Sequence, residues 1–190
     1  MENKGYQAER ELLEYVVNAG NSVSFRTLEG GSQSFPVEGI KTFGFTTSSK
    51  VDLVINPRVR LQVKSVNSNR ATIINKVPAR NFHKLAKREM LDTSPALELF
   101  QKLEGKGTVK LSSIAKKEDW EEMVKYFLFE GTATRQADKF FQATHLLEVG
   151  NDMVIIDKTE VLDYIWEKLT VELRVRAGKT EKTLNVRVGK

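Results

Sequence analysis

The sequence contains no cysteine, and this absence removes several classes of site at once. Without cysteine there is no disulfide framework, no zinc–thiolate cluster and no thiol nucleophile. The second of only two histidines, His145, has no other histidine or cysteine at ligand spacing, so we expect it to be structural. The sequence also lacks a P-loop, a GxGxxG segment and a Ser-His-Asp set in a suggestive order. The usual signatures of nucleotide binding and of serine or cysteine catalysis are therefore missing.

Long apolar runs are absent as well. No stretch approaches the length that spans a membrane, and the charged segment after Met1 has no apolar signal core, so we expect a cytoplasmic protein without a membrane partner. A chain of 190 residues with 40% hydrophobic content is long enough for one compact domain over residues 1–190. The net charge of +5 favours a polyanionic partner, although a lysine-rich solvated surface produces the same value.

The most informative residues are Asp52, Gln62 and Lys64. They lie in two predicted strands, VDLVI over 51–55 and RLQVKS over 60–65, joined by an Asn-Pro turn that allows an antiparallel hairpin. Because side chains alternate along a strand, Gln62 and Lys64 point the same way. A carboxylate, an amide and an amine then meet in one place, which suits a metal-dependent phosphodiesterase.

A second carboxylate comes from the predicted first helix, GYQAERELLEYVVNA over 5–19. Its apolar residues at helical spacing are Tyr6, Leu12, Leu13, Val16 and Val17, and Glu9 falls within this stripe. An unpaired buried carboxylate costs several kcal/mol, so Glu9 requires a cation or Lys64 beside it. The plain alternative is that Glu9 reaches a polar edge.

These residues resemble the PD-(D/E)xK nuclease superfamily, which includes type II restriction endonucleases. The resemblance covers 5–67 and consists of the Glu9 helix, the run Gly30-Gly31-Ser32-Gln33-Ser34, Asp52, and Gln62-Val63-Lys64. Val51 replaces the proline and Gln62 the acid of the pattern, and a QxK ending is most similar to Mrr-type enzymes. The resemblance implies an α/β fold, with a restriction-endonuclease-like mixed β-sheet flanked by helices.

The resemblance also implies roles for these residues. Asp52, the Gln62 side chain and the Val63 carbonyl are expected to bind Mg²⁺, with Glu9 orienting Lys64 or holding a second ion. Lys64 is expected to hold the attacking water and to stabilise charge on phosphorus. The products implied are ends that carry 5′-phosphates.

Residues 76–190 are expected to supply helices and a C-terminal β-hairpin for target recognition and dimerisation. A helix from Asn81 presents a cationic face, and two predicted strands, VELRVR over 171–176 and TLNVRV over 183–188, place arginines on one side. The DNA-contact candidates are Arg80, His83, Lys84, Lys87, Arg88, Arg174, Arg176 and Arg187. An ordinary solvated helix face and a solubilised sheet would look the same.

The other expected elements are read from periodicity and turn residues. We expect strands over 22–27, 40–45, 71–76 and 152–157, a loop over 29–38, and helices over 94–104, 117–130, 133–147 and 161–169.

The function predicted from the sequence is a Mg²⁺-dependent, sequence-specific endonuclease of duplex DNA, working as a homodimer. Two alternatives remain open: a Holliday junction resolvase with the same chemistry, and a non-catalytic DNA-binding module with a decayed nuclease fold. The recognised bases, the cut position, the methylation sensitivity and the oligomeric state are not readable from the sequence.

Overall fold

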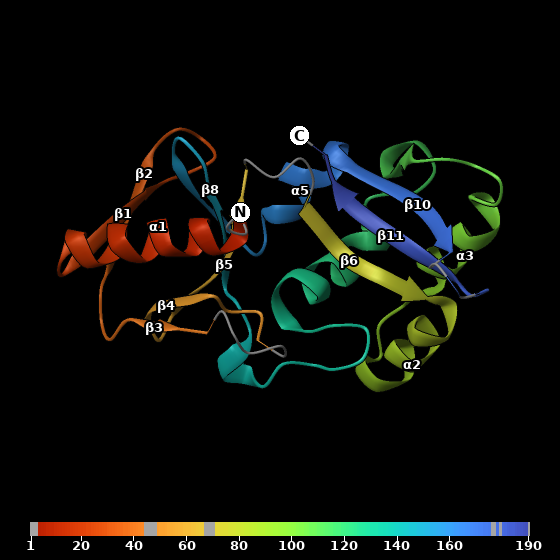
Figure 1. Ribbon diagram of the computed structural model, residues 1–190, viewed down its shortest axis with the longest axis horizontal. Helices are drawn as coiled ribbons and strands as arrows, with labels where there is room; N and C mark the ends of the chain where they lie inside the picture. The colour runs from red at the N-terminus through yellow and green to blue at the C-terminus, as the bar shows by residue number, and fades with distance from the viewer. Residues whose placement is uncertain (1–3, 44–48, 67–70, 176–177, 179, 190) are drawn as a thin grey trace. The chain divides into compact units, whose positions relative to one another are not determined.

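The computed structural model describes residues 4–43, 49–66, 71–175, 178 and 180–189 (Figure 1). Its described strands form two sheets, each within one of two compact units. Unit 1 comprises residues 1–69, 128–131 and 137–161, and unit 2 comprises residues 70–127, 132–136 and 162–190. The predicted catalytic region therefore lies in unit 1. The expectation of a single domain over 1–190 stays a prediction.

Unit 1 is built on a mixed sheet with the described strand order β2-β1-β9-β8-β5-β4-β3, in which β1 pairs with β9 and β5 with β8 in parallel and all other pairs are antiparallel. Its elements are α1 Lys4–Ala19, β1 Ser22–Arg26, β2 Ser32–Pro36, β3 Lys41–Thr42, β4 Leu53–Asn56, β5 Val59–Ser65, η3 Tyr126–Glu130, which begins in unit 2, η4 Lys139–Phe141, β8 His145–Val149 and β9 Met153–Asp157. The expected mixed sheet with flanking helices and the 52–65 hairpin are confirmed.

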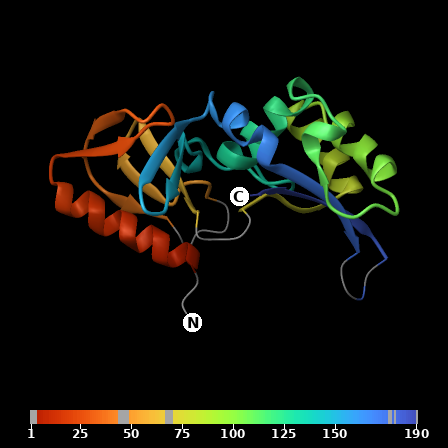
Figure 2. The same cartoon turned by 90° about the horizontal axis from the view of Figure 1, so that it is seen from above.

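Helix α1 covers one face of this sheet (Figure 2). Its Ala8, Leu12 and Val16 pack in one core with alternate strand residues such as Leu61 and Val63. Spacing of four along the helix and of two along the strand produces these two matching apolar surfaces.

The predicted helix stripe is partly wrong, because Tyr6 and Val17 are 47% and 56% exposed. The buried stripe is narrower and centres on Leu12, which lies one helical turn after Ala8 and one before Val16.

Unit 2 contains the second described sheet, with strand order β6-β11-β10-β7 and antiparallel pairing throughout. Its elements are β6 Ala71–Pro78, α2 Ala79–Glu89, α3 Ser94–Lys102, β7 Val109–Lys110, η1 Leu111–Ser113, η2 Glu118–Trp120, α4 Glu121–Lys125, α5 Val161–Ile165, which starts in unit 1, η5 Trp166–Lys168, β10 Leu169–Val175 and β11 Lys182–Val188. The expected C-terminal hairpin is confirmed as β10–β11. The expected helix over 117–130 is broken into η2, α4 and the π-helical turn η3.

Two sequence-based expectations are wrong. The expected loop over 29–38 contains β2, which pairs antiparallel with β1 from Ser22↔Pro36 to Arg26↔Ser32. The expected helix over 133–147 is a turn, the short η4 and the start of β8. β8 lies between β5 and β9, so sheet pairing with distant segments overrides the helical spacing of its apolar residues. Phe140, within that expected helix, is 81% exposed.

None of the helices in the described ranges has the length and apolar character needed to cross a membrane.

Candidate active site

The hairpin β4–β5 places Asp52 against the backbone of β5. Asp52 directly precedes β4, and its N–H donates to the Leu61 carbonyl at 2.8 Å. Its carboxylate Oδ2 accepts a hydrogen bond of 2.7 Å from the Val63 N–H. The carboxylate therefore takes the place of a main-chain acceptor for β5 at the position just before β4 begins. It lies at the edge of β5, where a partner strand would otherwise run.

The Val63 carbonyl faces the same edge. In an antiparallel pairing, the N–H and C=O of one residue point to the same neighbour. Because the Val63 N–H is directed at Asp52, the Val63 carbonyl oxygen is directed to the Asp52 side of β5. Asp52 and the Val63 main chain thus bring two kinds of oxygen to one edge.

Gln62 brings a third oxygen and leaves it unused. The residue is 8% exposed, and its side-chain Oε1 is buried without a hydrogen-bond partner among the described residues. A buried unsatisfied acceptor costs about 1–3 kcal/mol. A sequence that keeps an amide here, between buried Leu61 and Val63, thus bears a cost that a partner for Oε1 would remove.

Glu9 on α1 and Lys64 on β5 interact electrostatically with Asp52. Partial burial raises the pKa of Glu9, the charge of Asp52 raises it further, and Lys64 opposes both. Burial lowers the pKa of Lys64, because it disfavours the charged ammonium group, while the negative charges of Asp52 and Glu9 act to raise it. Burial raises the pKa of Asp52, while the Val63 hydrogen bond and the nearby lysines lower it. The structure thus brings Glu9, Asp52 and Lys64 within electrostatic reach of one another, with Gln62 two residues before Lys64 on β5, and the catalytic roles of all four stay predictions.

The sequence reasoning missed a second lysine, Lys50. Its pKa falls to about 8, mainly by burial and then by the charge of Lys64, while Asp52 acts to raise it. Its main-chain N–H donates to the Phe141 carbonyl at 2.8 Å, which anchors the segment before β4. The signal in the sequence was the position of Lys50, two residues before Asp52.

The site is poor in carboxylates. In the part of the chain that is described, no three His, Cys, Asp or Glu side chains are arranged to hold a metal. The available donors are instead two carboxylates, the Gln62 amide oxygen and a main-chain carbonyl. All of these are oxygens, the donor type that Mg²⁺ prefers. The unpartnered Gln62 Oε1 fits such an ion.

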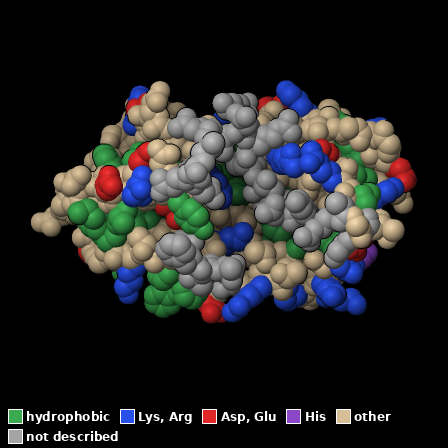
Figure 3. Space-filling model, in the orientation of Figure 1, with side chains coloured by type: hydrophobic (Ala, Val, Ile, Leu, Met, Phe, Trp, Pro, Cys, Tyr) green, Lys and Arg blue, Asp and Glu red, His purple; other side chains and the backbone are tan. Residues whose placement is uncertain are grey.

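The DNA-contact candidates on α2 differ in their availability. Figure 3 shows lysine and arginine side chains gathered over α2 and over the β10–β11 hairpin of unit 2. His83, Lys84 and Lys87 are exposed, and Arg80, 67% exposed, pairs with Glu181 at 3.1 Å. Arg88 is also exposed, but its Nε and Nη2 are bonded to Glu89, Tyr126 and Thr132.

The hairpin arginines are not a free basic ribbon. Glu172, a buried residue on β10, lies 2.9 Å from Nε of Arg174 and 3.2 Å from Nη1 of Arg187. The Arg187 side chain is only 18% exposed, so the expectation of a fully solvent-facing Arg187 is wrong. Sequence alternation placed it outward, but the carboxylate of Glu172 on the neighbouring strand draws it in. Arg176 lies outside the described residues.

Comparisons with known proteins give one distant structural likeness. The crystal structure of the restriction endonuclease MspI in complex with its cognate DNA is similar over 94% of this chain and 77% of that chain, with 13% sequence identity and a TM-score of 0.40. No protein-family model matches the sequence, and no curated protein matches it. A likeness at this level identifies neither the family nor the activity of the chain.

Proposed function

We propose that this chain is a Mg²⁺-dependent endonuclease of duplex DNA with a restriction-endonuclease-like catalytic unit. The observation that carries the proposal is the buried, unpartnered Oε1 of Gln62 on β5, the strand whose Lys64 interacts with Asp52 and Glu9. An amide oxygen left without a donor is explained by a cation that the chain binds. The motif resemblance and the net charge of +5 support a nucleic-acid substrate.

Asp52, Gln62 and the Val63 carbonyl would hold Mg²⁺ with oxygen ligands, and Glu9 is the further carboxylate beside them. When bound, the ion supplies Lewis acidity to a phosphoryl oxygen. The Val63 N–H fixes one oxygen of Asp52, which leaves the other for coordination. The raised pKa values of Glu9 and Asp52 support this assignment, because a cation at this place would offset the desolvation that raises them.

Lys64 would position the attacking water and stabilise the negative charge that develops on phosphorus. Its pKa is lowered by burial, so it exchanges a proton more readily than an exposed lysine does. Glu9 and Asp52 hold its ammonium group by charge attraction. Lys50 adds a second cation near Asp52, whose negative charge it partly compensates, and it repels Lys64.

The first prediction is that Asp52→Asn and Lys64→Met each lower single-turnover cleavage of plasmid DNA by about 10²- to 10³-fold, because each removes a transition-state contact or a metal ligand. Binding of duplex DNA in a gel-shift assay should persist. Matched controls are the variants Asp152→Asn and Lys41→Met, each at an exposed position of the same unit. Both control variants should cleave DNA at the normal rate. Discrete plasmid fragments would establish sequence specificity.

Near-normal cleavage by either site variant would contradict the assignment of these residues. The lack of a third acidic ligand in the described residues favours one other candidate, a DNA-binding module without catalysis. That candidate predicts tight duplex binding by the unmodified protein and no cleavage at any Mg²⁺ concentration.

A further inference from the structure

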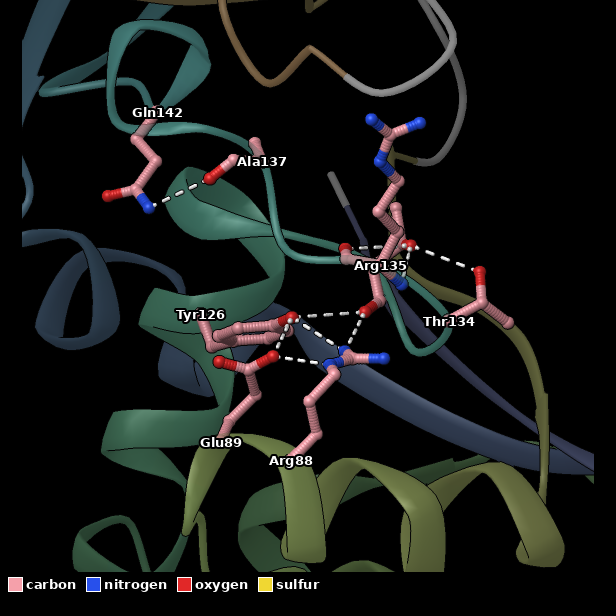
Figure 4. A network of polar contacts seen from close by, with 8 residues as sticks. Arg88, Glu89, Tyr126, Thr134, Arg135, Ala137 and Gln142 are labelled. Carbon is pink, nitrogen blue, oxygen red and sulfur yellow. Dashed lines mark hydrogen bonds and ion pairs between the residues drawn. The ribbon is translucent and has the colours of Figure 1, made fainter.

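A turn over 132–135 is tied to α2 by a network within unit 2 (Figure 4). Nη2 of Arg88 donates to the Tyr126 hydroxyl at 2.9 Å and to the Thr132 carbonyl at 3.2 Å, and the Tyr126 hydroxyl lies 3.2 Å from the same carbonyl. Glu89 pairs with Nε of Arg88. Tyr126 is 2% exposed, so the carbonyl of Thr132 is held by a buried hydroxyl as well as by a guanidinium.

Thr132 in turn fixes the main chain of Arg135. The Thr132 N–H donates to the Arg135 carbonyl at 2.7 Å, and the Thr132 hydroxyl accepts from the Arg135 N–H at 3.1 Å. Both main-chain polar groups of Arg135 are therefore held by one residue, and that residue is held by Arg88 and Tyr126.

The side chain of Arg135 has no such restraint. Arg135 is exposed, and its guanidinium makes no hydrogen bond or ion pair with any residue that the structure describes. Figure 4 shows it pointing away from the Arg88 guanidinium. The main chain of Arg135 is thus fixed through Thr132, Tyr126 and Arg88, while the charged end of its side chain has no partner among the described residues.

We propose that Arg135 contacts a phosphate of bound duplex DNA and that Arg88 and Tyr126 are positioning residues for it. The proposal rests on the proposed function for its ligand. A guanidinium matches the geometry of a phosphate with two parallel hydrogen bonds. A fixed main chain lowers the entropy lost when the side chain is ordered by a ligand.

The face of α2 that carries Arg88 has a second exposed cation. Lys84 precedes Arg88 by one helical turn on α2, so the two share a face, and Lys84 is exposed. Arg88 is already bonded within the protein, because its Nε donates to Glu89 and its Nη2 donates to Tyr126 and Thr132. In this proposal Arg88 acts through Arg135, while the sequence-based assignment of Arg88 as a direct DNA contact stays a prediction.

The first arm of the test measures the affinity for a mixed-sequence duplex without Mg²⁺ between about 50 and 200 mM salt. Arg135→Ala should weaken binding about tenfold and reduce the slope of log affinity against log salt by about one, the effect of losing one phosphate contact. The loss should be the same for different duplex sequences. Lys116→Ala, which removes an exposed charge elsewhere in unit 2, is the charge-matched control and should change the slope less.

The second arm tests positioning with a variant that leaves the net charge unchanged. Tyr126→Phe removes only the hydroxyl and should weaken binding severalfold, yet have no further effect when Arg135 is already alanine. Arg88→Lys should behave as Tyr126→Phe does, since it keeps the charge but loses the forked donors. Thermal unfolding of each variant shows whether the fold is retained.

The outcomes separate the two proposals. If the unmodified protein does not bind duplex DNA, the proposed function fails. If it binds and Arg135→Ala leaves affinity and slope unchanged, only the Arg135 assignment fails. A loss confined to one duplex sequence would make Arg135 a base contact and overturn the phosphate assignment. Additive losses for Tyr126→Phe and Arg135→Ala would overturn the positioning role.

Discussion

At the scale of single residues, Gln62 separates a structural reading of the site from a functional one. A buried amide kept only for packing gains nothing from an unpaired Oε1, and an apolar side chain of similar size would fill the same space. A metal ligand, in contrast, needs that oxygen free. Metal affinity and stability therefore respond to substitution at Gln62 in opposite ways.

Gln62→Leu should raise the Mg²⁺ concentration for half-maximal cleavage by about 10- to 100-fold or abolish cleavage. The metal-free variant should be as stable as the unmodified protein or more stable by about 1–2 kcal/mol, because the orphaned oxygen is gone. Gln62→Glu adds negative charge and should lower the Mg²⁺ requirement. Metal titrations at saturating DNA and urea unfolding without metal measure the two effects. An unchanged Mg²⁺ requirement in both variants would place Gln62 outside the coordination shell.

At the scale of elements, the seating of α1 determines where Glu9 lies. Leu12 is fully buried in the core that α1 shares with the sheet. It lies one helical turn after Ala8, the residue that directly precedes Glu9. The apolar side chains of the helix are therefore not equivalent, although all belong to one apparent sequence stripe. The difference between Leu12 and Val17 is one of contacts made, not of hydrophobicity.

Leu12→Ala should lower the free energy of unfolding by about 2–5 kcal/mol, because it removes a buried side chain and leaves a cavity. Val17→Ala, in the same helix but 56% exposed, should change it by less than about 0.5 kcal/mol. Urea unfolding followed by circular dichroism measures both. Equal losses would mean that α1 is seated with the broader stripe inferred from the sequence.

At the scale of the whole molecule, we expect the stability of the folded protein in acid to depend on His145, to which the sequence assigned a structural role. His145 begins β8, and its Nδ1 lies 2.8 Å from the Thr144 hydroxyl and its Nε2 3.6 Å from Oδ2 of Asp157. Together with Glu29 and Glu160, it lines a pocket of about 330 Å³ in unit 1. The expected structural role is consistent with these contacts.

Burial lowers the pKa of His145, and the facing carboxylate of Asp157 only partly opposes this shift. As pH falls through the ordinary histidine value of about 6.5, the unfolded chain takes up this proton before the folded protein does. The free energy of unfolding should therefore fall as pH is lowered from 7 through 6.5. His145→Gln should flatten this dependence, whereas His83→Gln, at an exposed position on α2, should leave it unchanged. Identical pH profiles for the two variants would rule out the buried imidazole as the cause.

The candidate catalytic cluster lies in unit 1 and the exposed lysines of α2 lie in unit 2. The expected homodimer stays a prediction, which sedimentation with and without duplex DNA would test.

The sequence by itself determined the features that depend on neighbours along the chain. The first helix, the 52–65 hairpin and the shared face of Gln62 and Lys64 follow from periods of 3.6 and 2, because these periods are properties of the local backbone. The C-terminal hairpin follows in the same way. These features were enough to place Asp52 beside the Gln62-Val63-Lys64 strand.

Only the tertiary structure decided what depends on segments far apart. The residues after Ala143 become β8 because β5 and β9 offer hydrogen bonds on both sides, which outweigh a helical spacing of apolar residues. Arg88, a cation on the surface of α2, is tied to a distant turn because Thr132, 44 residues later, presents its carbonyl to it. Local periodicity carries no information about such partners, since they are chosen by the burial and pairing of polar groups in the folded chain.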